Sequence, residues 1–123
     1  FKDAPRTPYH PSSRDITKEG DMNIIEFPLT ENPIFPGAPL GAGALNFFGL
    51  EKMLSAAEMS TGNNVIFLIH PWELVNLGEY YPTLKQGVKD ICSNDLQKFK
   101  LFFTEINKKF EFSTIFETFN SVK

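Results

Sequence analysis

A run of five apolar residues, residues 65–69, constrains the fold of this chain more than any other stretch. The run is too short to cross a membrane, and it lacks the polar alternation of a half-exposed strand. It predicts a central strand, parallel to its neighbours and covered on both faces. Pro71 ends the strand because proline has no N–H for a sheet ladder. Ligands gather at the carboxyl ends of such strands in α/β folds, and His70 lies at this end.

The residues before this run predict a βαβ unit. Residues 22–28 predict a short strand that ends at a proline, and residues 29–43, with three prolines and three glycines, predict a long loop. Residues 45–60 predict a helix whose apolar face contains Leu50, Met53, Leu54 and Ala57. A strand, a loop, a helix and a second strand in this order connect parallel strands, so the predicted fold class is α/β.

The residues after the run predict two further helices. Residues 74–93 contain glycine, proline and paired tyrosines and predict an irregular surface segment. Asn94 predicts the N-cap of a helix that extends to about residue 109. Its buried face is expected to contain Leu96, Phe99, Phe102, Phe103, Ile106 and Phe110. Residues 110–112 predict a short strand, and Thr114 with Glu117 predicts the capping box of a terminal helix to about residue 119.

Length, charge and cysteine content exclude several classes of protein. A chain of 123 residues has room for one domain, residues 1–123. Its net charge of -3 offers no basic surface for a phosphate backbone, so no nucleic-acid partner is expected. No run approaches the roughly 20 apolar residues of a membrane span. Cys92 is the only cysteine, which excludes an intrachain disulfide, and together with the lack of a signal-peptide pattern it favours a cytoplasmic location.

The sequence contains no complete metal site and no phosphate-binding motif. Two histidines, His10 and His70, do not suffice for the three-histidine site of a catalytic zinc, and His-x-x-x-His spacing is absent. The Gly-x-Ser-x-Gly motif and the glycine-rich phosphate motifs are absent as well. We therefore expect this chain alone to bind no metal.

The side chains that follow the apolar run are the candidates for chemistry. His70 is interpreted as an acid, a base or a ligand, or alternatively as a structural histidine. Trp72 and Glu73 either shape a pocket with it, or the indole closes the end of the sheet while the carboxylate meets solvent or a cation. Tyr80 and Tyr81 either form a wall for stacking against a sugar, or are simply exposed loop residues.

The stretch that ends in His70-Pro71-Trp72-Glu73 resembles the late strand of polysaccharide deacetylases of the NodB-homology type, carbohydrate esterase family 4. It is similar to the branch of that family that reads His-Pro-Trp-Glu at this point. Residues 3–9 resemble the proline-rich lead-in of this branch, residues 24–30 its following strand, and residues 36–43 its glycine-rich loop, which includes Gly41. Residues 112–117 are similar to its C-terminal end.

The resemblance implies the C-terminal half of a distorted (β/α) barrel, so the expected architecture is a partial (β/α) barrel. In this family a metal-activated water attacks an N-acetyl carbonyl of a carbohydrate polymer. The resemblance implies that His70 is the general acid that protonates the leaving amine. Trp72, Glu73, Gly41 and Tyr80 are the candidate substrate-binding residues. Arg6 is assigned no catalytic role.

The Asp-Asp motif and the His-x-x-x-His motif of the family are missing from this chain. The divalent metal, zinc or cobalt, is therefore expected to be held by an N-terminal half, and this chain alone is expected to be inactive. Half a barrel exposes strand edges, so a homo-oligomer is expected. The alternative interpretation is a non-catalytic carbohydrate-binding or assembly domain.

Overall fold

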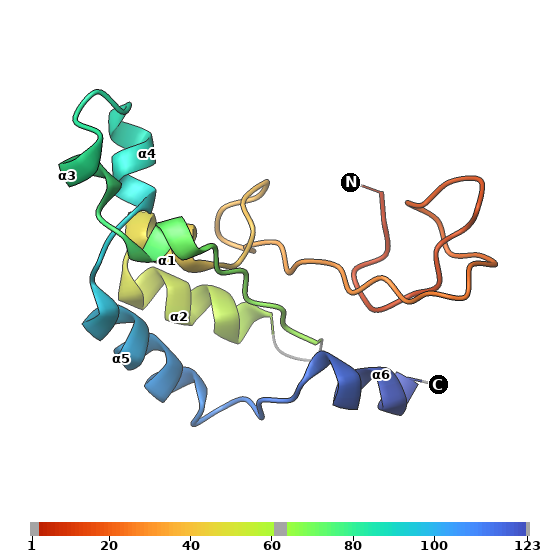
Figure 1. Ribbon diagram of the computed structural model, residues 1–123. Helices are drawn as coiled ribbons and strands as arrows, with labels where there is room; N and C mark the ends of the chain where they lie inside the picture. Colours follow the sequence, from red (N-terminus) through yellow and green to blue (C-terminus); the bar gives the residue numbers. More distant parts are fainter. Residues whose placement is uncertain (1–2, 61–63, 123) are drawn as a thin grey trace.

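The computed structural model describes residues 3–60 and 64–122 and is rich in helix (Figure 1). The helices are α1 (Ala42–Phe48), α2 (Leu50–Met59), α3 (Leu77–Tyr80), α4 (Gln86–Ile91), α5 (Leu96–Ile106) and α6 (Ile115–Val122), and the 3₁₀ helix η1 (Pro71–Leu74) precedes α3. Residues 3–39 form irregular loops beside the helices. In the described ranges, no helix combines the length and the apolar character that crossing a membrane requires.

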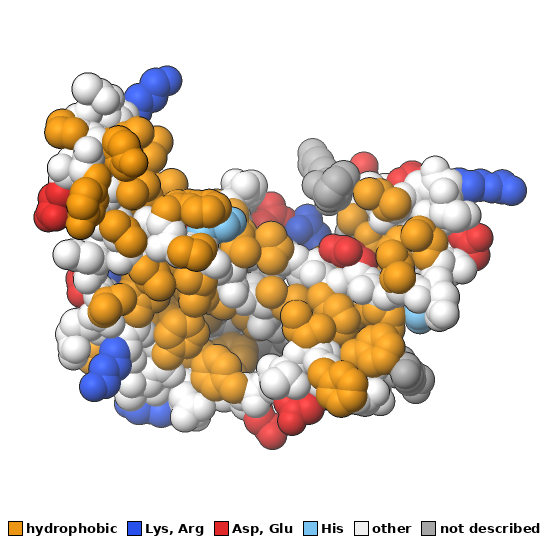
Figure 2. Space-filling view, viewed as in Figure 1, with side chains coloured by type: hydrophobic (Ala, Val, Ile, Leu, Met, Phe, Trp, Pro, Cys, Tyr) orange, Lys and Arg blue, Asp and Glu red, His pale blue; other side chains and the backbone are white. Residues whose placement is uncertain are grey.

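The core lies between α2 and α5 and extends beneath the start of α1. Leu40, Leu45 and Met53 are fully buried there, and Phe102 of α5 is 1% exposed. Helix α1 packs in turn against α2, α4 and η1. Apolar side chains also cover much of the surface over the helices (Figure 2). The helical spacing of apolar residues in 45–60 and 95–109 therefore identified the segments that build the core.

The predicted partial (β/α) barrel is wrong. The described residues form no sheet, and their pairings are isolated bridges, such as Tyr9 with Glu26 and Glu31 with Pro39. The predicted strand at residues 22–28 is reduced to the bridge at Glu26, and residues 110–112 form no strand. Prolines interrupt the paired segments and remove the N–H groups that a continuing ladder requires.

Residues 65–69 are extended but are not a strand covered on both faces. A single parallel bridge joins Leu68 to Gly41. The N–H of Leu68 donates to the carbonyl of Leu40 at 3.0 Å, and the N–H of Ala42 donates to the carbonyl of Leu68 at 2.8 Å. Ile69 is 43% exposed, and the other four residues are partly buried. The apolar composition of residues 65–69 predicted their burial, but in the described chain only one segment, at Gly41, pairs with them.

The predicted helix at residues 45–60 is interrupted at Gly49. This glycine ends α1 and begins α2 with φ 86° and ψ 172°, a backbone conformation that is essentially restricted to glycine. Its N–H donates to the carbonyl of Leu45 at 3.0 Å. The break lets α1 turn toward η1, while Met53 and Ala57 of α2 remain buried as predicted.

Replacing Gly49 with alanine is expected to lower the free energy of unfolding by about 1–3 kcal/mol, because only the backbone conformation is penalised. No atom lies within 4 Å of the position that the new Cβ would occupy, so a steric clash does not contribute. Urea denaturation of both proteins measures the difference. The matched control is Gly87→Ala in α4, which has equally open space and no positive φ. Equal stability of the Gly49 variant and the parent would contradict the positive φ of Gly49.

The two helices predicted near the C-terminus are confirmed with corrected boundaries. Asp95, rather than Asn94, caps α5, because its carboxylate accepts a hydrogen bond from the N–H of Lys98 at 3.0 Å. Leu96 is 61% exposed and does not belong to the buried face. Thr114 and Glu117 form the predicted capping box of α6 through reciprocal hydrogen bonds.

Candidate functional site

The sequence His70-Pro71-Trp72-Glu73 folds into a turn that closes on itself. Pro71 occupies the first position of η1, where its missing N–H costs nothing. The N–H of Glu73 donates to the carbonyl of His70 at 3.0 Å. In return, the N–H of His70 donates to Oε2 of Glu73 at 2.7 Å. These two hydrogen bonds bring the three predicted site residues together: His70, Trp72 and Glu73.

The imidazole of His70 is held between an indole and a carboxylate. Its ring stacks on Trp72 with centroids 4.3 Å apart and an interplanar angle of 17°. Nδ1 is shielded from solvent and lies 3.4 Å from Oε2 of Glu73, too far for a strong hydrogen bond. Since 38% of the side chain is nevertheless exposed, the accessible part of the ring lies away from Nδ1. The stacked indole and the nearby carboxylate thus restrict the ring, and its exposed edge is open to a ligand.

Glu73 is held in place by residues that the sequence did not reveal as part of the site. It is 8% exposed, and a Cβ on Gly43 would lie 2.6 Å from its Oε1, so a side chain at position 43 would displace this carboxylate. The carbonyl of Glu73 accepts hydrogen bonds from Nδ2 of Asn46 at 2.7 Å and from the N–H of Ser93 at 3.1 Å. These contacts span 20 to 30 residues of sequence, and no local pattern signals them.

A pocket of about 290 Å³ lies beside the carboxylate of Glu73. Gly41 lines it together with Leu68 and with aromatic side chains of α1, Phe47 and Phe48. Gly41 also has a structural role, because a Cβ there would lie 2.6 Å from the carbonyl oxygen of Leu68. The pocket therefore combines apolar walls with one buried carboxylate, a composition typical of small-molecule sites.

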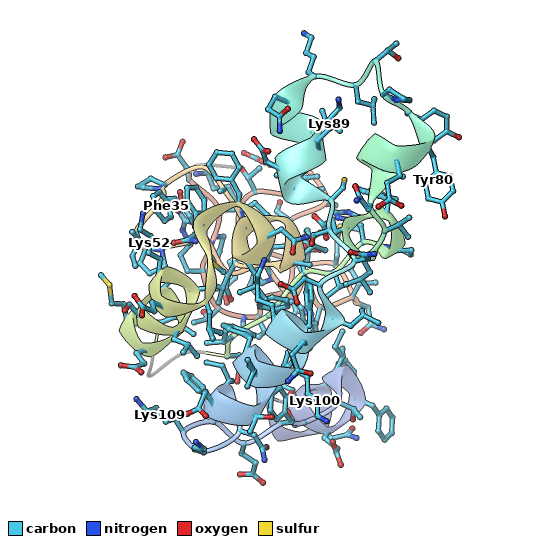
Figure 3. The ribbon with its side chains drawn as sticks, turned by 90° about the vertical axis from the view of Figure 1, so that its left-hand side faces the viewer. Phe35, Lys52, Tyr80, Lys89, Lys100 and Lys109 are labelled. Carbon is cyan, nitrogen blue, oxygen red and sulfur yellow. The ribbon has the colours of Figure 1, made fainter. Side chains whose placement is uncertain are left out.

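The aromatic candidates Trp72, Tyr80 and Tyr81 are all open to solvent. Trp72 is 50% exposed although one face of its ring lies against His70. Tyr80, at the end of α3, is 69% exposed and points away from the helices (Figure 3). Tyr80 does not line the pocket beside Glu73, so the structure groups it with the exposed surface rather than with His70.

The thiol of Cys92 is buried and lies near the carboxylate of Glu73. Burial, and after it the negative charge of Glu73, raise the pKa of the Cys92 thiol above its ordinary value of 9.0. The folded chain then holds the thiol proton more tightly than the unfolded chain. This contribution to stability is complete below pH 9.0 and is lost as the pH rises through the folded-state pKa.

The free energy of unfolding is therefore expected to fall as the pH rises above 9.0, and Cys92→Ala is expected to reduce that slope. Urea denaturation on both sides of this pH measures the slopes. Tyr9, whose pKa is also raised, contributes equally to both proteins and leaves the difference unaffected. Identical slopes would show that the thiol proton is not coupled to folding.

The described residues do not fit the metal that the deacetylase resemblance implies. Among residues 3–60 and 64–122, no group of three or more His, Cys, Asp and Glu side chains is arranged to hold a metal ion. The carboxylate of Glu73 is already bound by the backbone N–H of His70.

No family model, curated protein or solved structure matches this chain. The resemblance to polysaccharide deacetylases thus depends on the motif at residues 70–73 and on the order of the segments around it.

Proposed function

We propose that this chain supplies the proton donor and part of the substrate surface of a carbohydrate N-deacetylase, with His70 as the general acid. The observation that carries the proposal is the position of the imidazole ring. It stacks on Trp72, its Nδ1 lies near the carboxylate of Glu73, and its opposite edge is open to solvent. Hydrolysis of an acetamide requires a proton on the nitrogen as the C–N bond breaks, because an amide anion is a poor leaving group. A positioned imidazole performs this transfer near neutral pH.

In this proposal Glu73 is a positioning residue. Its carboxylate binds the backbone N–H of His70 and faces Nδ1, so it holds both the main chain and the ring. From α1, Asn46 binds the carbonyl of Glu73, and Gly43 leaves room for its carboxylate. The proton donor is thus anchored to the helical core, which satisfies the need for a rigid support around a catalytic group.

The exposed rings of Trp72 and Tyr80 suit a polymeric sugar, whose apolar ring faces pack on aromatic side chains. A metal that polarises the acetamide carbonyl would require ligands from residues other than the described ones. We therefore expect catalysis only when this chain is part of a larger assembly or polypeptide that contributes those ligands.

Acetate release from N-acetylglucosamine oligomers, measured with added zinc or cobalt, tests the proposal. The longest natural polypeptide that contains these residues is compared with the 123-residue chain. Activity in the longer form alone is expected. Activity in the short chain would contradict the expectation that the metal ligands come from outside it, and inactivity of both would contradict the deacetylase assignment.

Exposure of Trp72 and Tyr80 also favours a second candidate, a carbohydrate-binding domain without catalysis. Quenching or enhancement of the fluorescence of Trp72, the only tryptophan, on titration with the same oligomers would detect binding. Binding without acetate release in any form would support this second candidate over the first.

A further inference from the structure

The extended residues 65–69 use only one of their two edges for hydrogen bonding. The N–H of Ile66 donates to Oγ1 of Thr30 at 2.8 Å, and the N–H of Leu68 donates to the carbonyl of Leu40 at 3.0 Å. The carbonyl of Leu68 accepts from the N–H of Ala42. The main-chain groups of Ile66 and Leu68 therefore face the segment that leads into α1.

The odd-numbered residues face the opposite direction, because main-chain groups alternate between the edges of an extended segment. Val65, Phe67 and Ile69 find no hydrogen-bond partner for their N–H or C=O groups within residues 3–60 and 64–122. Such a row of donors and acceptors is a template for another strand. We call these three residues the open edge.

The surroundings of the open edge are apolar. Val65 and Phe67 line a pocket of about 200 Å³ together with Phe110, Phe112 and Ile115. Phe112 and Ile115 are 56% and 63% exposed, and residues 64–69 carry no charge and no proline. A paired strand would thus gain main-chain hydrogen bonds and would cover apolar side chains at the same time.

We propose that the open edge pairs with the open edge of a second copy of this chain, in an antiparallel ladder centred on Phe67. In this register Phe67 lies opposite the partner's Phe67, and Val65 lies opposite the partner's Ile69. Hydrogen-bonded pairs recur at every second residue of an antiparallel ladder, which matches the spacing of the three unpaired residues. A two-fold axis through Phe67 places residues 65–69 of one copy against the same residues of the other. These residues carry no charge, so the two copies do not repel each other at this edge.

Sedimentation velocity from low to high micromolar concentration tests this interface. The chain is expected to be a dimer that dissociates on dilution. Ile69→Pro removes an unpaired N–H without removing an intrachain hydrogen bond, and it is expected to weaken dimerisation at least about tenfold. Ile69→Thr, which keeps both the N–H and a β-branched side chain, is expected to remain dimeric.

Amide hydrogen exchange of the unsubstituted chain gives a second measurement that does not depend on the folding of a variant. Protection of the Phe67 and Ile69 amides is expected to increase with protein concentration, whereas protection of the Leu68 amide, already bonded to Leu40, is expected to stay constant. A monomer at every concentration, a dimer that Ile69→Pro leaves intact, or concentration-independent exchange at Phe67 would overturn the proposal.

Discussion

Substitution of His70 by alanine is expected to lower the rate of acetate release by about 10²–10⁴-fold in the longest natural polypeptide that contains this chain. The departing amine would leave without a proton donor, while the stacked indole of Trp72 and the buried carboxylate of Glu73 would remain. Because the loss concerns the transition state, the fall is expected in kcat rather than in KM. Initial rates over a range of oligomer concentrations separate the two constants.

His10→Ala is the matched control, since it removes the other histidine of the chain. Its ring contacts the carbonyl of Met22 in an exposed loop, far along the chain from the site. Unchanged activity is expected for this variant. A His70 variant that retains full kcat would exclude the histidine as the acid and would leave the carbohydrate-binding candidate as the better explanation of the exposed aromatic residues.

Truncation of Phe102 to alanine is expected to lower the free energy of unfolding by about 3–5 kcal/mol, a large fraction of the stability of a small domain. Phe102 is 1% exposed, and its ring lies 5.0 Å from that of Phe67 and 5.4 Å from that of Phe103. The substitution removes buried apolar surface and leaves a cavity between α5 and the extended residues 65–69. Chemical denaturation followed by circular dichroism measures the change.

The control for this experiment is Phe116→Ala, because Phe116 also lies in a helix but is 72% exposed. A change of at most about 0.5 kcal/mol is expected there. If both substitutions cost the same, the core assigned to α2 and α5 would be incorrect.

Local sequence patterns predicted the helices better than any other part of the fold. The spacing of Phe99, Phe102 and Ile106 predicted the buried face of α5, and Thr114 with Glu117 predicted the start of α6. These signals depend on residues three or four positions apart, which are neighbours in any helix. The break between α1 and α2 was missed because the helical spacing of apolar residues continues past Gly49, and the turn at this residue is seen only in the packing of α1 against η1 and α4.

The predicted sheet failed because strand pairing depends on distant segments. The five apolar residues 65–69 have the composition of a buried strand, but a strand also requires neighbours of sufficient length. The described chain offers them one bridge, to Gly41, and the preceding prolines prevent its extension. The apolar composition of residues 65–69 predicted that they would be buried. Whether neighbouring strands were available to pair with them was decided by the tertiary structure.

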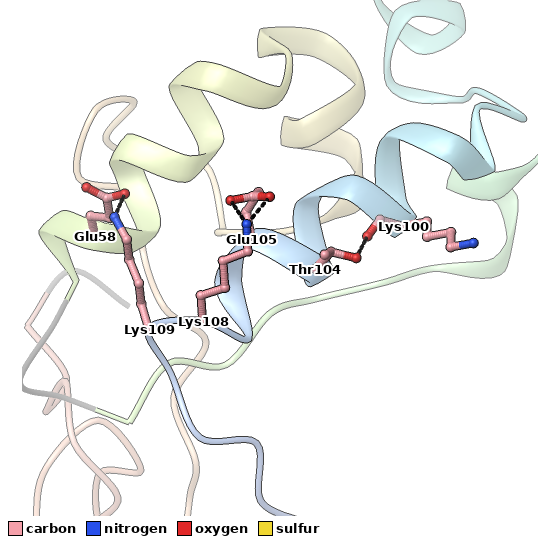
Figure 4. A network of polar contacts seen from close by, with 6 residues as sticks. All are labelled: Glu58, Lys100, Thr104, Glu105, Lys108 and Lys109. Atoms are coloured by element: carbon pink, nitrogen blue, oxygen red, sulfur yellow. Dashed lines mark hydrogen bonds and ion pairs between the residues drawn. The ribbon is translucent and has the colours of Figure 1, made fainter.

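Two surface ion pairs show the same difference between contacts that local spacing predicts and contacts that depend on the tertiary structure. Lys108 contacts Glu105 three residues earlier, a pair that helical spacing alone predicts (Figure 4). Lys109 instead contacts Glu58, which links the end of α5 to α2 across 51 positions of sequence (Figure 4). All four side chains are largely exposed, so neither pair contributes much to stability.

The sequence by itself determined the local chemistry of the site: an imidazole, an indole and a carboxylate within four residues, with a proline that favours the turn between them. The tertiary structure decided what supports that turn, because Gly43 and Asn46 reach Glu73 only after α1 packs against η1. It also decided which edge of residues 65–69 is paired and which is open. Hydrogen bonds within a turn follow from residue spacing, whereas burial and pairing between distant segments follow from how the whole chain fills space.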